Sequence, residues 1–114
     1  RSEQKLKKLS DLFNNLEFSE WGKIEVADVY INATSVGLEK NSKLGLDLTN
    51  IKNKLFYDVI YNPEKTNFLE DAEKNNNRIA NGKMMFLYQA QASFKIWTGV
   101  EPVITDEVIK TLND

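Results

Sequence analysis

The chain has 114 residues, of which 41% are hydrophobic and 28% are charged, and its formal net charge is −2. These values are typical of one soluble globular domain, and they argue against a disordered chain and against a general binder of nucleic acids. No apolar run approaches the ~20 residues that a membrane helix needs, and the chain starts without a signal-peptide pattern. We therefore expect a cytoplasmic protein that contacts neither membranes nor nucleic acids.

Two missing residue types restrict the chemistry. The chain has no histidine and no cysteine, which excludes Ser–His and Cys–His catalytic pairs as well as thiolate or imidazole zinc sites. We predict no metal site and find no carboxylate pair with a clear acid–base role. Because the first residue is Arg1 rather than methionine, we expect the sequence to be part of a longer product.

Apolar periodicity and capping residues predict four helices and three strands. Ser2, Thr66 and Thr105 are predicted N-caps, and Gly99 is predicted to end the longest helix. In chain order we expect a helix from Glu3 to about Phe13, a strand in the apolar run from Val26 to Ala33, a loop from Thr34 to Asn53, a strand from Leu55 to Tyr61, a helix from Thr66 to about Asn75, a short strand from Arg78 to Ala80, a helix from Lys83 to Trp97, and a helix from Thr105 to about Leu112.

This order of elements indicates the fold class. Nearly continuous apolar strands alongside helices are typical of a parallel sheet that helices cover. The order helix, strand, strand, helix, short strand, helix, helix predicts the second half of a doubly wound α/β sheet, followed by C-terminal helices. The first strand with its Gly-rich turn, which would open the first half, is absent from the sequence.

Polar residues follow both long strands. Ligands of such sheets bind at the carboxyl ends of the strands, which draws attention to Thr34 and Ser35 after the first strand and to Tyr61 at the end of the second. Asn, Ser, Gly and Pro in these segments are also ordinary turn residues. The spacing alone leaves both interpretations open.

The long helix carries one unusual polar residue. At 100° per residue, Gln89 falls in the middle of the apolar face, whereas Gln91 and Lys95 fall on the opposite, solvated face. A buried amide without partners costs roughly 1–3 kcal/mol, so Gln89 needs a partner in the protein or in a ligand. Phe13, Phe56 and Phe94 are predicted to lie in the core.

The first helix begins with a cluster of cations, where the helix dipole disfavours positive charge. The cluster consists of Arg1, Lys5, Lys7 and Lys8. It is either a solvated face or a binding site for an anion such as a phosphate.

Three sequence blocks together resemble the C-terminal half of the shikimate dehydrogenase family. They are INATSVGL (residues 31–38), DVIYNPEKTNFLEDA (residues 58–72) and NGKMMFLYQAQASFKIWTG (residues 81–99). Each block is moderately specific, but their order and spacing fit the family along the whole chain. The resemblance implies a Rossmann-like fold, with residues 1–114 forming a partial NADP-binding domain with C-terminal helices.

The resemblance also implies an activity and a cofactor. The family reversibly reduces 3-dehydroshikimate to shikimate with NADPH, in the biosynthesis of aromatic amino acids. Arg1 and Ser2 resemble the end of a motif whose arginine binds the 2′-phosphate of NADP, and Lys5 matches a second basic position there. The residues expected to line the remainder of the cofactor are Thr34, Ser35, Val59, Gly82 and Met85.

For the substrate, the resemblance assigns two residues, Tyr61 and Gln89, which match the tyrosine and glutamine that hold the polar groups of shikimate. Leu38 and Phe86 depart from the family, which usually has Met and Leu there. Lys65 lies near Tyr61 but falls in a variable turn of the family.

No catalytic residue is assigned in this chain. The catalytic Lys and Asp of the family lie in an N-terminal substrate domain that has no counterpart here, and the Gly-rich loop is also missing. We therefore expect this chain to need the missing N-terminal half and to be inactive alone. Two alternatives remain, a quinate/shikimate dehydrogenase that prefers NAD and a non-catalytic nucleotide-binding module.

Overall fold

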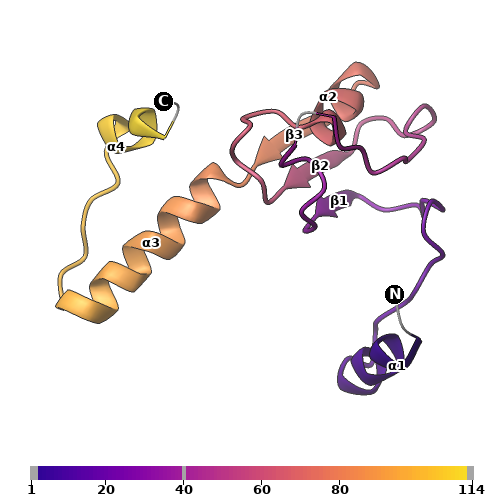
Figure 1. The fold of residues 1–114 in the computed structure, drawn as a ribbon, viewed down its shortest axis with the longest axis horizontal. Coiled ribbons are helices and arrows are strands. Elements are labelled where there is room, and N and C mark those ends of the chain that lie inside the picture. Colours follow the sequence, from indigo (N-terminus) through magenta and orange to yellow (C-terminus); the bar gives the residue numbers. More distant parts are fainter. Residues whose placement is uncertain (1–2, 40, 113–114) are drawn as a thin grey trace.

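A computed structural model describes residues 3–39 and 41–112 of the chain. The described part contains the seven expected elements in the expected order (Figure 1). They are α1 (Glu3–Leu12), β1 (Val29–Asn32), β2 (Leu55–Asp58), α2 (Asn67–Lys74), β3 (Arg78–Asn81), α3 (Lys83–Thr98) and α4 (Asp106–Thr111). The predicted cap Ser2 lies outside the described residues.

The three strands form one parallel sheet in the order β1-β2-β3. Asn32 at the end of β1 lies beside Asp58 at the end of β2, and Asp58 lies beside Asn81 at the end of β3. All three carboxyl ends therefore meet at one edge of the sheet. The α/β architecture with a parallel sheet, expected from the order of elements, is confirmed.

Strands β1 and β2 are shorter than the apolar runs predicted, whereas β3 extends one residue beyond the predicted Ala80. The run from Leu55 to Tyr61 continues past the end of β2, where the backbone N–H of Ile60 donates a hydrogen bond of 3.0 Å to Oδ1 of Asp58. A side chain that captures a nearby backbone donor competes with the strand ladder. Strand β2 ends at Asp58, although the N–H of Val59 still donates to the carbonyl of Asn32 at 3.0 Å. The segment that carries Tyr61 is a turn.

The core lies between the sheet and α2. Phe56 is fully buried and contacts Leu48 from the long loop together with Leu69 and Ala72 from α2. Its ring stacks on Tyr30 of β1 at a centroid distance of 4.7 Å. Phe56 was predicted in the core, and this prediction is confirmed.

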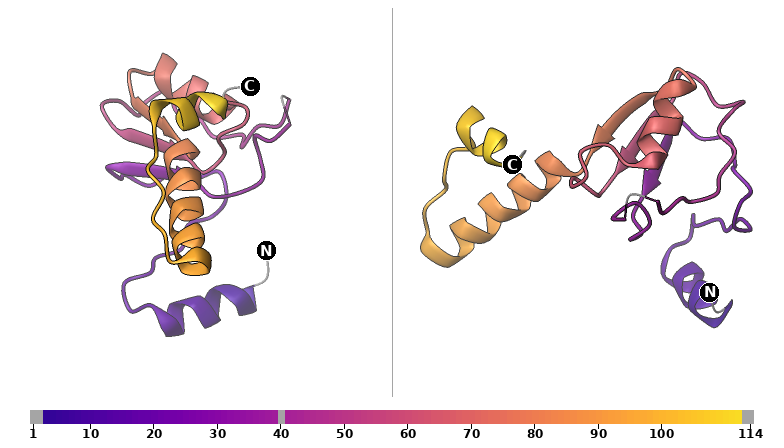
Figure 2. Two further views of the ribbon diagram at one scale, coloured as in Figure 1. Left: turned by 90° about the vertical axis from the view of Figure 1, so that its left-hand side faces the viewer. Right: turned by 45° about the horizontal axis from the view of Figure 1, so that its top comes forward.

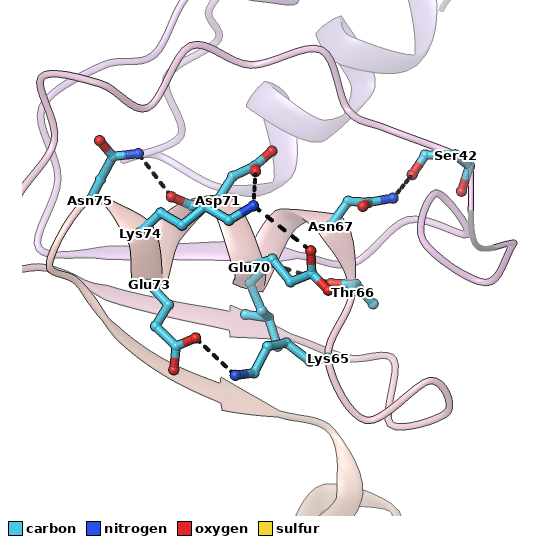
Figure 3. Close-up of polar contacts among 10 residues, drawn as sticks. Ser42, Lys65, Thr66, Asn67, Glu70, Asp71, Glu73, Lys74 and Asn75 are labelled. Carbon is cyan, nitrogen blue, oxygen red and sulfur yellow. Dashed lines mark hydrogen bonds and ion pairs between the residues drawn. The ribbon is translucent and has the colours of Figure 1, made fainter.

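Helix α2 is fixed by its cap and by surface contacts that Figure 3 shows. The hydroxyl of Thr66 accepts a hydrogen bond from the N–H of Leu69, as expected of an N-cap. Asn67 donates to the carbonyl of Ser42 at 3.2 Å, which holds the long loop against the start of the helix. Lys74 near the end of α2 pairs with two carboxylates of the same helix.

The opposite face of the sheet and the outer helices are more open. Val29 and Ile31 of β1 are exposed, and α1, α3 and α4 extend away from the sheet (Figures 1 and 2). The radius of gyration is 17.0 Å, compared with about 13 Å for a compact domain of this length. Within the described residues, only α2 packs on the sheet, so the prediction of a helix-covered sheet holds for one face.

The predictions that Phe13 and Phe94 lie in the core are wrong, and for the same reason. Phe13 after α1 is 58% exposed and Phe94 on α3 is 44% exposed. Both lie on elements that project from the sheet, where the described chain supplies too few apolar partners to bury them. None of the described helices is both long and apolar enough to cross a membrane.

Candidate functional site

The loop after β1 is held by the side chain of Asn32. Its Oδ1 accepts hydrogen bonds from the backbone N–H of Thr34 at 3.1 Å and from the Thr34 hydroxyl at 2.8 Å. Its Nδ2 donates to the carbonyl of Val36 at 2.9 Å. Because Asn32 is buried and makes all these bonds, it fixes the loop with Thr34 and Ser35 exposed at the carboxyl end of the sheet.

The hydroxyl of Thr34 is occupied within this loop. It donates to Asn32 and also accepts a hydrogen bond of 3.1 Å from the N–H of Val36. Thr34 can therefore offer a ligand mainly its carbonyl and its methyl group. Ser35 beside it is exposed.

Asp58 connects the first loop to the turn after β2. Its Oδ2 accepts hydrogen bonds from Nδ2 of Asn32 at 3.1 Å and from the hydroxyl of Thr66 at 2.6 Å. Its Oδ1 accepts from the N–H of Ile60. This carboxylate is fully buried and thus ties together three segments of the chain.

Val59 and Gly82, both expected near the nicotinamide, are brought together. A Cβ built on Gly82 would lie 2.0 Å from the carbonyl oxygen of Val59, a distance that no side chain can occupy. The N–H of Gly82 also donates to the carbonyl of Ile60 at 3.3 Å. Only glycine permits this approach between the backbone after β2 and the start of α3.

The turn that carries Tyr61 is also pinned from the side of β3. Nδ2 of Asn81 donates to the carbonyl of Glu64 at 2.9 Å, and the ammonium of Lys83 lies 3.8 Å from the Glu64 carboxylate. The sequence-based predictions did not single out Asn81. The available sequence signal for Asn81 was its position directly after the predicted short strand from Arg78 to Ala80.

Tyr61 itself packs on the long helix. Its ring stacks on Phe86 with a centroid distance of 4.8 Å and an interplanar angle of 29°. None of the described residues forms a hydrogen bond with the Tyr61 hydroxyl. The stack holds the ring while the hydroxyl remains available to a ligand.

Gln89 lies one turn further along α3, and its predicted burial is wrong. Its side chain is exposed and bonds to none of the described residues. Gln91, predicted to be solvated, is instead half-buried and donates to the carbonyl of Pro102 at 2.7 Å. The segment after α3 folds back onto Gln91, whereas the described chain places nothing over the face that carries Gln89.

The remaining predicted residues lie on different parts of the molecule. Met85 is exposed on the first turn of α3. Lys5 is exposed on α1, which stands apart from the sheet (Figure 2). Arg1 and Ser2 lie outside the described residues, so the structure brings together the sheet-edge residues but not the basic ones.

Lys65 forms its ion pair with α2 and not with Tyr61. Its ammonium forms an ion pair of 2.8 Å with Glu73 on α2 (Figure 3). The hydrogen bond that the Lys65 ammonium donates to the Glu73 carboxylate raises the pKa of Lys65 above its usual value, which favours the protonated form. A proton-accepting role of Lys65 is therefore disfavoured.

An open pocket of about 640 Å³ lies between the loop after β1 and the start of α2. Leu38, Pro63 and Glu70 are among the residues that line it, and none of the predicted site residues does. No group of three or more potential metal ligands occurs in the described part of the chain. The pocket adds no support to the predicted site.

Asp58 and Asn32 are the main residues that the sequence-based predictions missed. A signal for Asp58 existed, because an acidic side chain inside an apolar strand must be paired when it is buried. The sequence could not identify its partners, which come from positions 26 residues before it and eight residues after it.

Comparison with known proteins identifies the family. The chain is 44% identical over 114 residues to a shikimate dehydrogenase (NADP(+)) of Pelagibacter ubique, and the match covers 99% of this chain. The chain belongs to the shikimate dehydrogenase family. The family model described as the shikimate 5'-dehydrogenase C-terminal domain matches residues 85–111.

Solved structures agree with this assignment. A shikimate dehydrogenase of Aquifex aeolicus superposes with a TM-score of 0.79 and 30% identity over 98% of this chain and 41% of its own. A shikimate 5-dehydrogenase of Listeria monocytogenes, in complex with shikimate and NAD, superposes with a TM-score of 0.64 and 31% identity over 75% of this chain and 30% of its own. The chain also spans only 43% of the length of the Pelagibacter relative.

Proposed function

We propose that this chain is the cofactor-side part of an NADP-dependent shikimate dehydrogenase, which reversibly reduces 3-dehydroshikimate to shikimate. The observation that carries the proposal is the 44% identity to the Pelagibacter enzyme along nearly the whole chain. The exposed polar groups at the carboxyl edge of a parallel sheet support it, because dinucleotides bind at this edge.

The residues present fit a dinucleotide. The exposed Thr34 and Ser35 offer polar groups beside β1, and Met85 offers an exposed apolar side chain at the start of α3. NADPH, when bound, supplies the hydride that reduces the substrate carbonyl. Val59, Gly82 and Met85 would contact its nicotinamide end, and Arg1, Ser2 and Lys5 would bind the 2′-phosphate through charge-assisted hydrogen bonds.

Tyr61 and Gln89 would orient the substrate. Both side chains leave their polar groups without partners among the described residues, and both lie on or against the first half of α3. A hydroxylated ring such as shikimate could accept and donate hydrogen bonds there. The proton donor for the reduced carbonyl would come from outside this chain, from the family's N-terminal half, and residues 1–114 alone should be inactive.

The test uses the complete gene product that contains this chain. We expect oxidation of shikimate with NADP to be faster than with NAD, and oxidation of quinate to be slower than that of shikimate. A preference for NAD together with good use of quinate would favour the quinate/shikimate type. Nucleotide binding without turnover of either substrate would favour the non-catalytic module.

Tyr61→Phe tests the substrate role directly. The variant keeps the ring stack on Phe86 and removes one hydroxyl, so the KM for shikimate should rise about two- to tenfold while the KM for NADP stays unchanged. Tyr88→Phe is the matched control, because Tyr88 is an exposed tyrosine on α3, the helix that carries Phe86. Equal effects of the two variants would exclude the assigned role of Tyr61.

A further inference from the structure

Three segments at the carboxyl edge of the sheet converge on one buried carboxylate. Asp58 accepts hydrogen bonds from the Asn32 side chain, from the Ile60 backbone and from the Thr66 hydroxyl, at 3.1, 3.0 and 2.6 Å. None of its surface is exposed to solvent. Water therefore cannot replace a bond that is lost at this position.

The three partners require an acceptor at position 58. An amide N–H, a backbone N–H and a hydroxyl are all acting as donors, and a carboxylate offers acceptor oxygens on both sides without a competing donor. An asparagine would bring an NH₂ group against either the Ile60 N–H or the pair formed by Asn32 and Thr66. The mismatch would leave at least one buried donor unsatisfied.

The bonds reach both parts of the proposed ligand site. Through Asn32, Asp58 is connected to Thr34 and Val36, the loop expected to lie along the cofactor. Through Ile60, it holds the residue directly before Tyr61. Gly37 packs against the same group of residues, because a Cβ built on it would lie 3.1 Å from the Thr66 side chain.

We propose that Asp58 is a positioning residue that sets the cofactor-side loop (residues 33–37) and the turn bearing Tyr61 in one fixed relation. Asp58 itself does not touch the reactants. Hydride transfer depends on placing the two reactants within a fraction of an ångström. Asp58 affects this placement because its carboxylate holds both the cofactor-side loop and the turn that bears Tyr61. This inference rests on the proposed function of the site.

The test compares two isosteric exchanges at opposite ends of the same sheet, Asp58→Asn and Asn77→Asp. Asn77 is also buried, and it bonds to the N–H of Lys54 and the carbonyls of Ile51 and Ala72 beyond the amino ends of the strands. Both variants should lower the melting temperature of the complete gene product. Steady-state kinetics are then measured at a temperature where circular dichroism shows both variants to be folded.

Under those conditions Asp58→Asn should lower kcat/KM for shikimate by about 10- to 100-fold, because displaced reactants lose rate steeply. Asn77→Asp should stay within about twofold of the wild type. Equal kinetics in the two variants would overturn the proposal, because a purely structural role predicts equal behaviour once both proteins are folded.

A second readout does not depend on activity. Amide hydrogen exchange should accelerate at Val36 and Ile60 in Asp58→Asn, and at Lys54 in Asn77→Asp. If the wild type shows no shikimate turnover, the proposed function fails, and this exchange pattern alone upholds or overturns the anchoring of the two segments by Asp58. Uniformly faster exchange in both variants would overturn it.

If Asp58→Asn does not fold, Thr66→Val removes one of the three bonds while nearly preserving side-chain volume. Thr66 is also an N-cap, so Thr105→Val, which removes the equivalent cap of α4, is the control for that loss. We expect Thr66→Val to reduce kcat/KM at least about threefold more than Thr105→Val, and Thr66→Ser to restore it. No difference between the two valine variants would overturn the proposal.

Discussion

The sheet with α2 and the outer helices α1 and α4 differ in where their apolar side chains lie. Among the described residues, the buried hydrophobic side chains all fall between Leu48 and Leu87. Leu6 and Leu9 of α1 are exposed although they share one helix face, and α4 buries no residue. Amphipathic spacing therefore determines which face of a helix is apolar, but that face becomes buried only where another part of the protein packs against it.

The largest expected effect lies on the sheet side of this comparison. Phe56→Ala removes a fully buried ring that contacts two further aromatic rings, and it should lower the free energy of unfolding by about 3–5 kcal/mol. Urea denaturation of the 114-residue chain measures it. Phe13→Ala is the control on the outer side and should change the value by less than about 0.5 kcal/mol. Similar losses in both variants would abolish the distinction between the two regions.

An intermediate effect is expected where the chain beyond α3 folds back. Gln91→Ala removes the hydrogen bond to Pro102 and should lower local stability by about 0.5–1.5 kcal/mol. Faster amide exchange in α4 would report it. Gln89→Ala, two residues away on the exposed face, should leave exchange in α4 unchanged while weakening shikimate binding by the complete gene product. If both variants accelerate exchange equally, the contact with Pro102 does not hold α4.

The smallest effect is expected at the end of α3. Trp97 is 80% exposed, so Trp97→Ala should change the unfolding free energy of the 114-residue chain by less than about 0.5 kcal/mol. The urea midpoint and the slope of the transition measure this. A loss above about 1 kcal/mol would mean that the helix face carrying Trp97 is covered in solution, and the end of α3 would then belong with the sheet and α2 in this comparison.

Much of the fold could be predicted from the sequence because its signals are local. The threonines at positions 66 and 105 mark helix starts, and Gly99 ends α3 in the left-handed conformation with φ of 74°. The end of β2 could not be predicted, since its last residue, Asp58, is where a side chain captures the Ile60 N–H. The exposure of Phe94 and Gln89 was also unpredictable, because hydrophobicity does not reveal whether a partner lies within the chain.

Some residues of the candidate site could be predicted from the sequence and others could not, because the latter depend on contacts between distant segments. Tyr61 and Gly82 were predicted as site residues from the family motifs, and the structure adds what holds them in place: a ring stack on Phe86 and a close backbone approach at Val59. Asp58 and Asn32 lie within the quoted family blocks, but the roles that the resemblance assigns there are those of ligand-contacting residues, so neither residue was singled out. Their role depends on hydrogen bonds between residues far apart in sequence.

The shared anchor at Asp58 also has a consequence for how this chain can change in evolution. A mutation of Asp58, Asn32 or Thr66 alone leaves a buried donor or acceptor unmatched, and a second change at one of the other two positions can remove the mismatch. Lineages that have replaced one of the three should therefore often have replaced another as well. Across a family alignment we expect these positions to vary together, while exposed neighbours such as Ser35 vary independently.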